Sequence, residues 1–292
     1  ATRAVLALCR DRLGRTMDGE DTRDAVRVLH RLSLATVTHD TTANEGGSSL
    51  LRVHALVQRA TREATPDGLH RPLAVTAADA LIELWPDPER DATHAQHLRA
   101  NTVRLHATTG TLLWDQQEGA HPVLFRAGNS LGETGLVAAA VAYYHDLHTT
   151  AHQHLGPDHP HTLATRHNLA NWRGQAGDPA GAATALEQLL TDRLRILGPD
   201  HPHTLTTRHN LAYWRGEAGD PAGAATALKQ LLTDRLRILG PDHPDTLTTR
   251  HNLARWRGRA GVSDDRAEHD RRHQSRRFRW TWRGTRKPEL NG

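Results

Sequence analysis

Several residue types on which whole classes of protein depend are scarce in this sequence. Cys9 is its only cysteine, which excludes an intrachain disulfide framework and a zinc cage built from cysteines. Its only lysines are Lys229 and Lys287, and neither stands between the glycine and the serine or threonine that a phosphate-binding loop requires. No run of about 18 apolar residues occurs, so we expect no membrane-spanning helix. With a single cysteine, we expect a reducing, cytoplasmic location.

The composition favours helices. Aromatic residues make up 4% of the chain and apolar residues 37%. A β-sandwich usually needs β-branched and aromatic strands, whereas this sequence is rich in alanine, leucine and arginine. We expect a core built from leucine, alanine and valine. The length of 292 residues suggests about two domains.

Positive charge gathers at one end of the chain. The net charge is +4 with histidine neutral, and residues 262–292 alone hold nine basic and five acidic residues. The rest of the chain is therefore neutral overall. The basic character belongs to a tail and not to the fold.

A 42-residue repeat dominates the second half of the sequence. The run Gly-Pro-Asp-His-Pro occupies residues 156–160, 198–202 and 240–244. The copies at 156–197 and 198–239 differ at four positions, which are Ala164/Thr206, Asn171/Tyr213, Gln175/Glu217 and Glu187/Lys229. Such self-similarity is typical of repeat architectures.

Each repeat is predicted to form two antiparallel helices. Pro160 suits the first turn of a helix that Asp158 or His159 caps. An Asp-Pro pair then begins a second helix, whose leucines and alanines form a broad apolar face. We therefore expect helices near 160–176 and 179–197, and again 42 residues later. One hairpin cannot bury its apolar faces alone, so neighbouring hairpins should stack into a solenoid.

These repeats resemble a known family. The run Leu-Gly-Pro-Asp-His-Pro, followed by Asn-Leu-Ala and Ala-Gly-Asp, is similar to tetratricopeptide repeats of the 42-residue, kinesin-light-chain-like type over residues 156–261. Ala170, Ala182 and Leu186 fall where that family has its small, small and large packing residues. Arg173 departs from the aromatic residue that the family usually has at its position. The resemblance implies a mostly α-helical chain with a right-handed solenoid of helix hairpins.

The N-terminal part of the chain has a different pattern. Residues 21–34 and 54–63 have the apolar spacing of amphipathic helices, and Ala35–Thr38 and Leu50–Val53 are strand candidates around a polar loop. Helix, hairpin, helix is a winged-helix arrangement. With the segment that follows, this run resembles the part of actinobacterial STAND (NB-ARC-type) signalling ATPases that links the nucleotide-binding module to the repeats. These residues include no P-loop, so the resemblance implies nothing about ATP binding by this chain.

The patterns divide the chain into seven parts. They are a winged-helix-like remnant (1–66), a linking helical region (67–120), a degenerate repeat (121–155), two tetratricopeptide repeats (156–197 and 198–239), a partial repeat (240–261) and a basic tail (262–292). The third copy breaks off after Gly261, so we expect the array to lack its last helix. We expect the tail to be disordered, because it combines high charge with few aliphatic residues.

The sequence predicts no catalytic, cofactor or metal site. It contains neither a Gly-x-Ser-x-Gly elbow nor a His-Glu-x-x-His helix, and its carboxylates mostly lie at helix starts or on helical surfaces. His159 and His161, which recur as His201 and His203, have a spacing that could begin a metal site. The third copy has Asp245 in place of the second histidine, and polar capping explains the pattern more simply. We therefore expect a protein that is not an enzyme.

The expected binding site lies on the first helix of each repeat. At about 100° per residue, one arc of this helix combines polar residues with tryptophan, and the arc recurs in each copy. In the family, the corresponding asparagine holds peptide backbone in kinesin-light-chain-like grooves. We therefore predict that a peptide or protein partner binds in the concave repeat groove, and that the chain is a non-catalytic scaffold, the sensing arm of a STAND-type signalling or regulatory protein. The predicted contact residues are Asn168, Trp172, Asn210, Trp214, Asn252 and Trp256. An alternative for the tryptophans is packing between repeats.

A second hypothesis is a transcriptional regulator that binds nucleic acid through the winged helix or the tail. Basic and aromatic residues are interspersed over residues 271–287. Phosphates attract the basic residues and bases stack on the aromatic ones. Weak polyanion contact is expected at Arg271, Arg272, Arg276, Arg277 and Arg279.

Because neither lysine lies in a phosphate-binding loop, we expect the purified chain neither to bind nor to hydrolyse ATP. Calorimetric titration with Mg-ATP should give no saturable heat, and phosphate release should stay at the level of buffer. A saturable, stoichiometric affinity for ATP would contradict this expectation.

Overall fold

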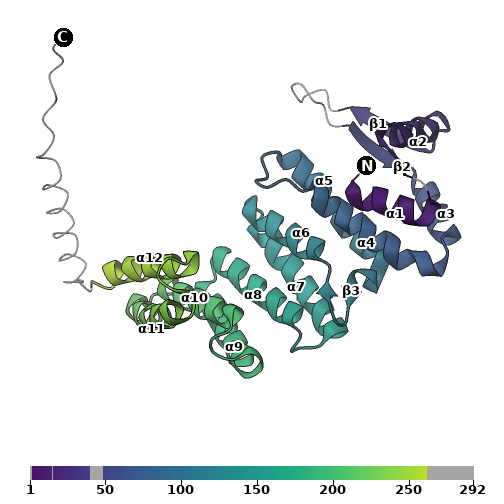
Figure 1. Cartoon of the computed structure of the whole chain (residues 1–292). Helices are drawn as coiled ribbons and strands as arrows, with labels where there is room; N and C mark the ends of the chain where they lie inside the picture. The colour runs from purple at the N-terminus through teal and green to yellow at the C-terminus, as the bar shows by residue number, and fades with distance from the viewer. Residues whose placement is uncertain (1, 15, 40–48, 262–292) are drawn as a thin grey trace, which may run out of the picture. The chain divides into compact units, whose positions relative to one another are not determined.

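The computed structural model describes residues 2–14, 16–39 and 49–261, which fall into two compact units. The first unit runs from Ala1 to Trp172 and the second from Arg173 to Gly292. Helices dominate both units, so the predicted mostly α-helical repeat fold is confirmed (Figure 1). Within the described ranges, no helix is both long enough and apolar enough to cross a membrane. The tail predicted to be disordered, 262–292, lies outside the described residues.

The first unit contains most of the helices and all of the described strands. Its elements in chain order are α1 (Arg3–Leu13), α2 (Gly19–Arg31), β1 (Ala35–His39), β2 (Ser49–Val53), α3 (Ala55–Ala64), α4 (Asp67–Leu84), α5 (Ala92–Thr109), the 3-10 turn η1 (Gly110–Leu113), β3 (Trp114–Asp115), β4 (Gly119–Ala120), α6 (Pro122–Glu133), α7 (Val137–Leu155) and the start of α8 (Pro160–Gln175).

The N-terminal helix, hairpin and helix follow the order that the sequence predicted. Strands β1 and β2 pair antiparallel, with Ala35 opposite Val53, and each is one residue longer than predicted. Helix α2 ends at Arg31, three residues before the predicted end, because Ser33 has a φ of 55° and turns the chain into β1. In Figure 1 the hairpin lies beside α2.

The linking region consists of two long helices and a small hairpin. Helices α4 and α5 pack on each other, and β3 pairs antiparallel with β4 so that Trp114 lies opposite Ala120. The sequence predicted the helical character of this region but not the hairpin. Each of its strands has two residues, which is too short for an alternating apolar pattern to appear.

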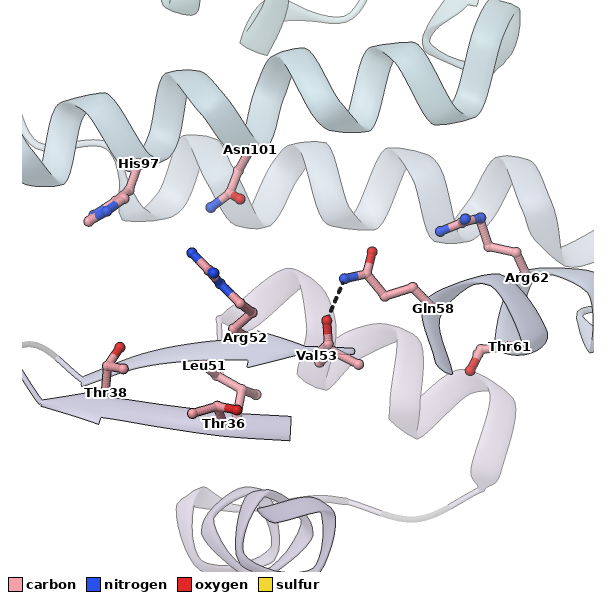
Figure 2. A pocket seen from close by; sticks show the side chains of 10 residues that line it. All are labelled: Thr36, Thr38, Leu51, Arg52, Val53, Gln58, Thr61, Arg62, His97 and Asn101. Atoms are coloured by element: carbon pink, nitrogen blue, oxygen red, sulfur yellow. Dashed lines mark hydrogen bonds between the residues drawn. The ribbon is translucent and has the colours of Figure 1, made fainter. Parts of the chain in front are cut away.

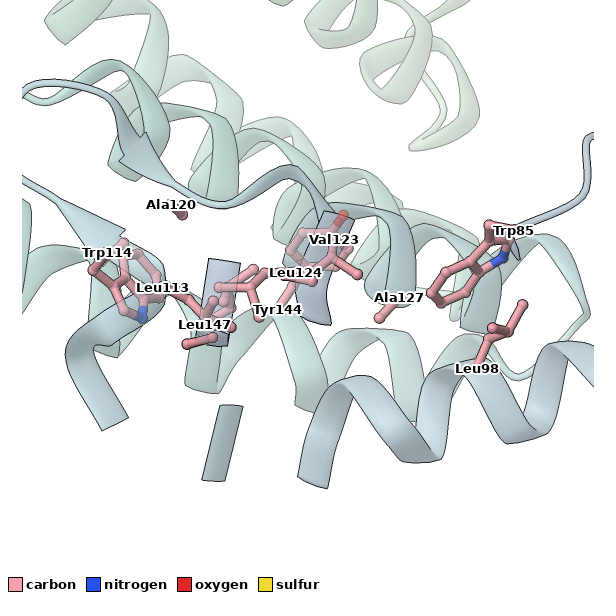
Figure 3. Packing of buried hydrophobic residues seen from close by; sticks show 13 residues of the cluster. Trp85, Leu98, Leu113, Trp114, Ala120, Val123, Leu124, Ala127, Tyr144 and Leu147 are labelled. Atoms are coloured by element: carbon pink, nitrogen blue, oxygen red, sulfur yellow. The ribbon is translucent and has the colours of Figure 1, made fainter. Parts of the chain in front are cut away.

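The core of the first unit lies among α4, α5, α6 and α7. Figure 3 shows Trp85 and Leu98 near Ala127 at one end of this cluster, and Leu113 with Trp114 at the other. The expectation of a core made of leucine, alanine and valine is therefore incomplete. Aromatic residues are few, but several lie in the core because one such ring buries about 150–250 Å² of surface.

The second unit consists of repeated helices. Helix α8 contains the boundary between the units and is followed by α9 (Pro179–Leu197), α10 (Pro202–Glu217), α11 (Pro221–Leu239) and α12 (Pro244–Arg259). These bounds confirm the helices predicted near 160–176 and 179–197 and their copies 42 residues later. The Asp220 carboxylate caps α11 by accepting a hydrogen bond from Gly223 N at 2.8 Å. Gly240 closes the same helix with a φ of 86°, which glycine adopts without strain.

A tryptophan ring packs on a glycine of the preceding repeat. In the second unit, a Cβ atom added to Gly216 would lie 2.7 Å from the Trp256 ring, and one added to Gly174 would lie 2.7 Å from the Trp214 ring. The first unit repeats the contact between Gly132 and Trp172. A separation under 3.0 Å is one that real Cβ atoms essentially never show. The close packing of these helices therefore depends on glycine at this position.

We expect Gly216→Ala to lower the free energy of unfolding by about 1–3 kcal/mol, because the added methyl group overlaps the Trp256 ring. The matched control is Gly258→Ala, one repeat later, where an added Cβ meets nothing within 4 Å. Because alanine has a higher helix propensity than glycine, Gly258→Ala should leave the free energy of unfolding unchanged or raise it by up to about 1 kcal/mol. Urea unfolding followed by circular dichroism measures both. Equal effects of the two substitutions would contradict the proposed role of the glycine.

Candidate functional site

The first helices of the second unit present a polar surface that continues from one repeat to the next. We call it the first-helix face. It comprises Asn210, Tyr213 and Glu217 of α10 and Asn252, Arg255 and Arg259 of α12.

Ion pairs join the two helices of the first-helix face. Arg255 Nη2 donates to Glu217 Oε1 at 2.5 Å, and Arg259 Nη1 donates to Glu217 Oε2 at 3.2 Å. The Arg255 guanidinium also lies 5.3 Å from the centre of the Tyr213 ring. The Glu217 side chain is 26% exposed and that of Arg259 is 50% exposed. Both charges can therefore also meet a partner from solvent.

A buried histidine joins the asparagine of this face to the preceding repeat. Asn252 Nδ2 lies 2.9 Å from His209 Nε2, and Thr249 Oγ1 lies 3.5 Å from His209 Nδ1. Burial, with a smaller contribution from the charge of Arg235, lowers the pKa of His209 to about 4. The ring is thus neutral at pH 7. In the tautomer that fits these partners, Nε2 accepts from the Asn252 amide and Nδ1–H faces the Thr249 hydroxyl.

Beneath the first-helix face, a buried arginine of α9 and one of α11 form hydrogen bonds with the first helix that follows. Arg235 of α11 is 3% exposed and donates to Asp245 O at 2.8 Å and to Thr249 Oγ1 at 2.6 Å. Arg193 of α9 makes the same contact with Thr207 Oγ1 at 2.5 Å. Thr207 and Thr249 belong to the polar arc that recurs in each first helix, yet both are fully buried, because arginine and backbone groups satisfy their hydroxyls.

In the first unit, Asn168 occupies the corresponding position on α8. Its side chain is hydrogen-bonded to the hydroxyl of Tyr144, which also donates to Asn129 Oδ1 at 2.6 Å. Burial raises the pKa of Tyr144 well above its usual value. Asn168, Asn210 and Asn252 are each half-buried.

The tryptophans lie mostly below the surface. Trp214 is 8% exposed and Trp256 is 1% exposed, and each ring packs on a glycine. Trp172 is half-buried over Gly132. Packing between repeats, the alternative left open for these rings, is therefore what they do in this structure.

The repeated histidines cap helices. His201 Nδ1 accepts a hydrogen bond from the backbone N–H two residues later at 3.1 Å, and His243 does so at 3.2 Å. In the first unit His159 does the same at 3.0 Å. Histidine is thus a cap of these helices, one of the two residues that the sequence left open. Within the described ranges, no group of three His, Cys, Asp or Glu side chains is placed to hold a metal ion.

A buried ion cluster of the first unit has a packing function. The Glu89 side chain is 6% exposed and lies 2.8 Å from Arg126 Nη2. It also accepts hydrogen bonds from Trp85 Nε1 at 2.6 Å and Ser130 Oγ at 2.8 Å. With these partners the carboxylate is held in place, and it joins the segment before α5 to α6.

A polar cavity of about 820 Å³ lies between the β1–β2 hairpin, α3 and α5. Figure 2 shows Arg52 of β2 pointing towards His97 and Asn101 of α5, with Arg62 of α3 at the other end. The described residues that line it include these two arginines and a histidine but no carboxylate. Such a lining suits an anionic group.

Comparison with known proteins identifies the repeats. Residues 127–161, 162–203 and 204–245 each match the tetratricopeptide repeat family. Residues 127–245 of this chain therefore carry tetratricopeptide repeats.

The fold resembles crystal structures of nearly identical TPR-like repeats from a Podosopora anserina protein assigned as a kinesin light chain. One structure, of a point variant, is 21% identical with a TM-score of 0.51, and the match covers 74% of this chain and 95% of that chain. A second is also 21% identical with a TM-score of 0.51, covering 76% and 100%. At this identity the likeness concerns the fold. No curated protein matches this chain in sequence.

Sequence reasoning missed the buried residues that join the repeats. Arg193, Arg235 and His209 do not stand out in the sequence patterns described above. A signal was present, since each arginine lies within a leucine-rich run, in Leu-Leu-Thr-Asp-Arg-Leu-Arg-Ile-Leu. The tail arginines from Arg271 to Arg279 lie outside the described residues.

The buried His209 makes stability depend on pH. Its folded-state pKa of about 4 lies below the ordinary 6.5, so the unfolded chain takes up the proton first. The free energy of unfolding is thus highest above pH 6.5 and decreases as the pH falls towards 4. We expect the decrease to be about 3 kcal/mol, from 1.4 kcal/mol per pKa unit.

Urea unfolding at a series of pH values between 7 and 4 measures this effect. In His209→Gln, the slope of unfolding free energy against pH should be smaller than in the wild-type chain. The matched control is His251→Gln, which changes the corresponding exposed histidine one repeat later. An unchanged slope in His209→Gln would contradict the assignment.

Proposed function

We propose that this protein is a non-catalytic scaffold that holds a peptide or protein partner in a groove along the first helices of its repeats. In the second unit, the contact residues of this proposal are Asn210 and Asn252, with Tyr213, Glu217, Arg255 and Arg259 beside them and Trp214 and Trp256 packed beneath them. In the first unit, the proposal keeps Asn168 and Trp172, which occupy the corresponding positions of α8.

The observation that carries this proposal is the continuity of the first-helix face. Contacts from Asn252 to His209 and from Arg255 to Glu217 hold side chains of successive first helices side by side. An amide that donates through one N–H still has an acceptor oxygen and a second N–H, which can pair with the backbone of an extended peptide.

Selectivity would come from positions at which the repeats differ. Tyr213 and Arg255 occupy equivalent positions, as do Glu217 and Arg259. At the first of these positions, α10 presents an aromatic ring and α12 a cation. At the second, α10 presents a negative charge and α12 a positive one. Such changes favour one partner and exclude others while the scaffold stays fixed.

We further infer that the chain is the sensing arm of a cytoplasmic STAND-type signalling protein. This inference is supported by the order of elements, in which a helix, a hairpin and a helix precede the repeats, and by the resemblance carried by the N-terminal sequence. Reading the coding sequence upstream of Ala1 tests it. A phosphate-binding loop encoded there supports the inference, and its absence contradicts it.

A second candidate is a regulator that binds nucleic acid through the winged-helix-like region or the tail. The basic lining of the cavity formed by Arg52, Arg62 and His97 favours it, because phosphates would be attracted there. In that case the affinity for DNA or RNA would fall steeply with increasing salt concentration. It would also be reduced when these residues or the tail arginines are replaced.

To test the groove, peptides displayed on phage can be selected against the full chain and their affinities measured by fluorescence anisotropy. We expect the double variant Asn210→Ala/Asn252→Ala to bind a selected peptide at least tenfold more weakly, a loss of about 1.4 kcal/mol. The reason is that the variant loses hydrogen bonds to the peptide backbone.

The matched control is Gln188→Ala/Gln230→Ala, which removes two exposed amides from the second helices and should leave affinity unchanged. Circular dichroism checks that both variants are folded. The groove assignment is wrong if the folded asparagine variant keeps full affinity for every selected peptide. DNA or RNA binding would be measured in the same way. The second candidate is supported if the asparagine variant keeps this binding while Arg52→Ser/Arg62→Ser, or replacement of the tail arginines, abolishes it.

A further inference from the structure

The last described helix, α12, repeats α10 in sequence but has one face that no described residue covers. Leu205 of α10 is 1% exposed, whereas Leu247, 42 residues later, is 47% exposed. Ala212 is likewise buried and Ala254 exposed. An apolar stripe that is buried in one repeat is thus open to solvent in the next.

Two further residues extend this stripe along one face of α12. His251 and Gly258 are exposed, although their counterparts His209 and Gly216 are buried. Leu247, His251, Ala254 and Gly258 follow the spacing of a single helical face. We call this surface, together with Arg250, the α12 end face.

The preceding repeat shows what kind of surface fits here. In α10, Leu205 and Ala212 belong to one core cluster with Ala224 and Leu228 of α11. Arg208 of α10 pairs with a carboxylate of α11, Asp234, at 2.8 Å. The part of α10 with Leu205 and Ala212 is thus covered by an amphipathic helix that has a stripe of alanine and leucine and an acidic residue in its second half. His209 and Gly216 are covered by the next first helix, α12.

The tail that follows α12 does not supply such a helix in register. Forty-two residues after Ala224, Leu228 and Leu231 of α11, the sequence has Arg266, Asp270 and His273. Charged or polar side chains therefore stand where the covering helix needs apolar ones. A second copy of the chain has helices of the right kind in α9 and α11, but Leu189 and Leu231 are already buried in its own repeats.

We propose that the α12 end face is a docking site for an amphipathic helix of a partner protein, one with an alanine and leucine stripe and a carboxylate that pairs with Arg250. Charge supports an acidic partner, because α12 exposes Arg250 beside this stripe. The site is separate from the groove of the proposed function, and it would let the scaffold hold two partners.

A helical peptide with the sequence of α11, residues 221–239, is the probe. A lactam between Thr226→Glu and Gln230→Lys, both on its exposed side, keeps it helical in isolation. Anisotropy of the labelled peptide with the full chain should show saturable binding at a ratio of one to one. Ala254→Arg in the full chain should weaken it at least tenfold, because the larger side chain blocks the stripe.

The matched control is Gln230→Arg in the full chain, which adds the same charge to an exposed position of α11 and should leave binding unchanged. A charge exchange tests the orientation. Arg250→Glu should weaken the probe, and a probe carrying Asp234→Arg should bind this variant more tightly than it binds the wild-type chain.

Three outcomes would overturn the proposal. The first is no saturable binding of the probe, or binding that Ala254→Arg leaves unchanged. The second is a doubling of the mass of the chain in light scattering that Ala254→Arg abolishes, since the occupant would then be a second copy. The third is a tenfold gain in probe affinity when Trp280→Ser/Trp282→Ser is introduced, because the chain's own tail would then be the occupant.

Discussion

The distance between successive first helices of this array depends on a glycine in each of them. Because Gly216 has no Cβ atom, the Trp256 ring lies directly against the backbone of the preceding first helix. The ring is 1% exposed and belongs to the same cluster as Leu205 and Leu228. Dispersion contacts fall off steeply with distance, so this close approach contributes more than a ring held further away by a methyl group. The contact also fixes how far one first helix lies from the next, and the positions of all surface residues follow from that distance.

Hydrogen bonds between neighbouring helices fix their register, which the apolar contacts alone do not determine. Arg235 reaches from α11 to the first turns of α12, and His209 reaches from α10 to Asn252. Buried groups of this kind add little net stability, but a shifted register would leave them without partners, at a cost of several kcal/mol. The contact with His209 uses one N–H of the Asn252 amide, which leaves its second N–H and its oxygen for a partner. The structural and the proposed binding roles of this asparagine are therefore compatible.

The helices of the repeats were predictable because local residues indicate where each helix starts and ends. These residues recur three times, 42 positions apart. The strands of the N-terminal hairpin were predictable for the same reason. The burial of Trp214, Thr207 and Arg193 was not, since it depends on neighbours one repeat away, and a helical wheel treats the helix as isolated. The small β3–β4 hairpin and the Glu89 cluster depend on contacts between distant segments, which no local pattern encodes.

The near identity of residues 156–197 and 198–239 has a consequence at the level of the gene. The glycine–tryptophan and arginine–threonine contacts between repeats join residues at a fixed offset, so removing or duplicating 42 residues recreates the same glycine beside the same ring and the same arginine beside the same threonine. The array can therefore change length in one step without any new interface having to evolve. The reach of its binding surface would vary by whole repeats, while its final helix keeps the same open face.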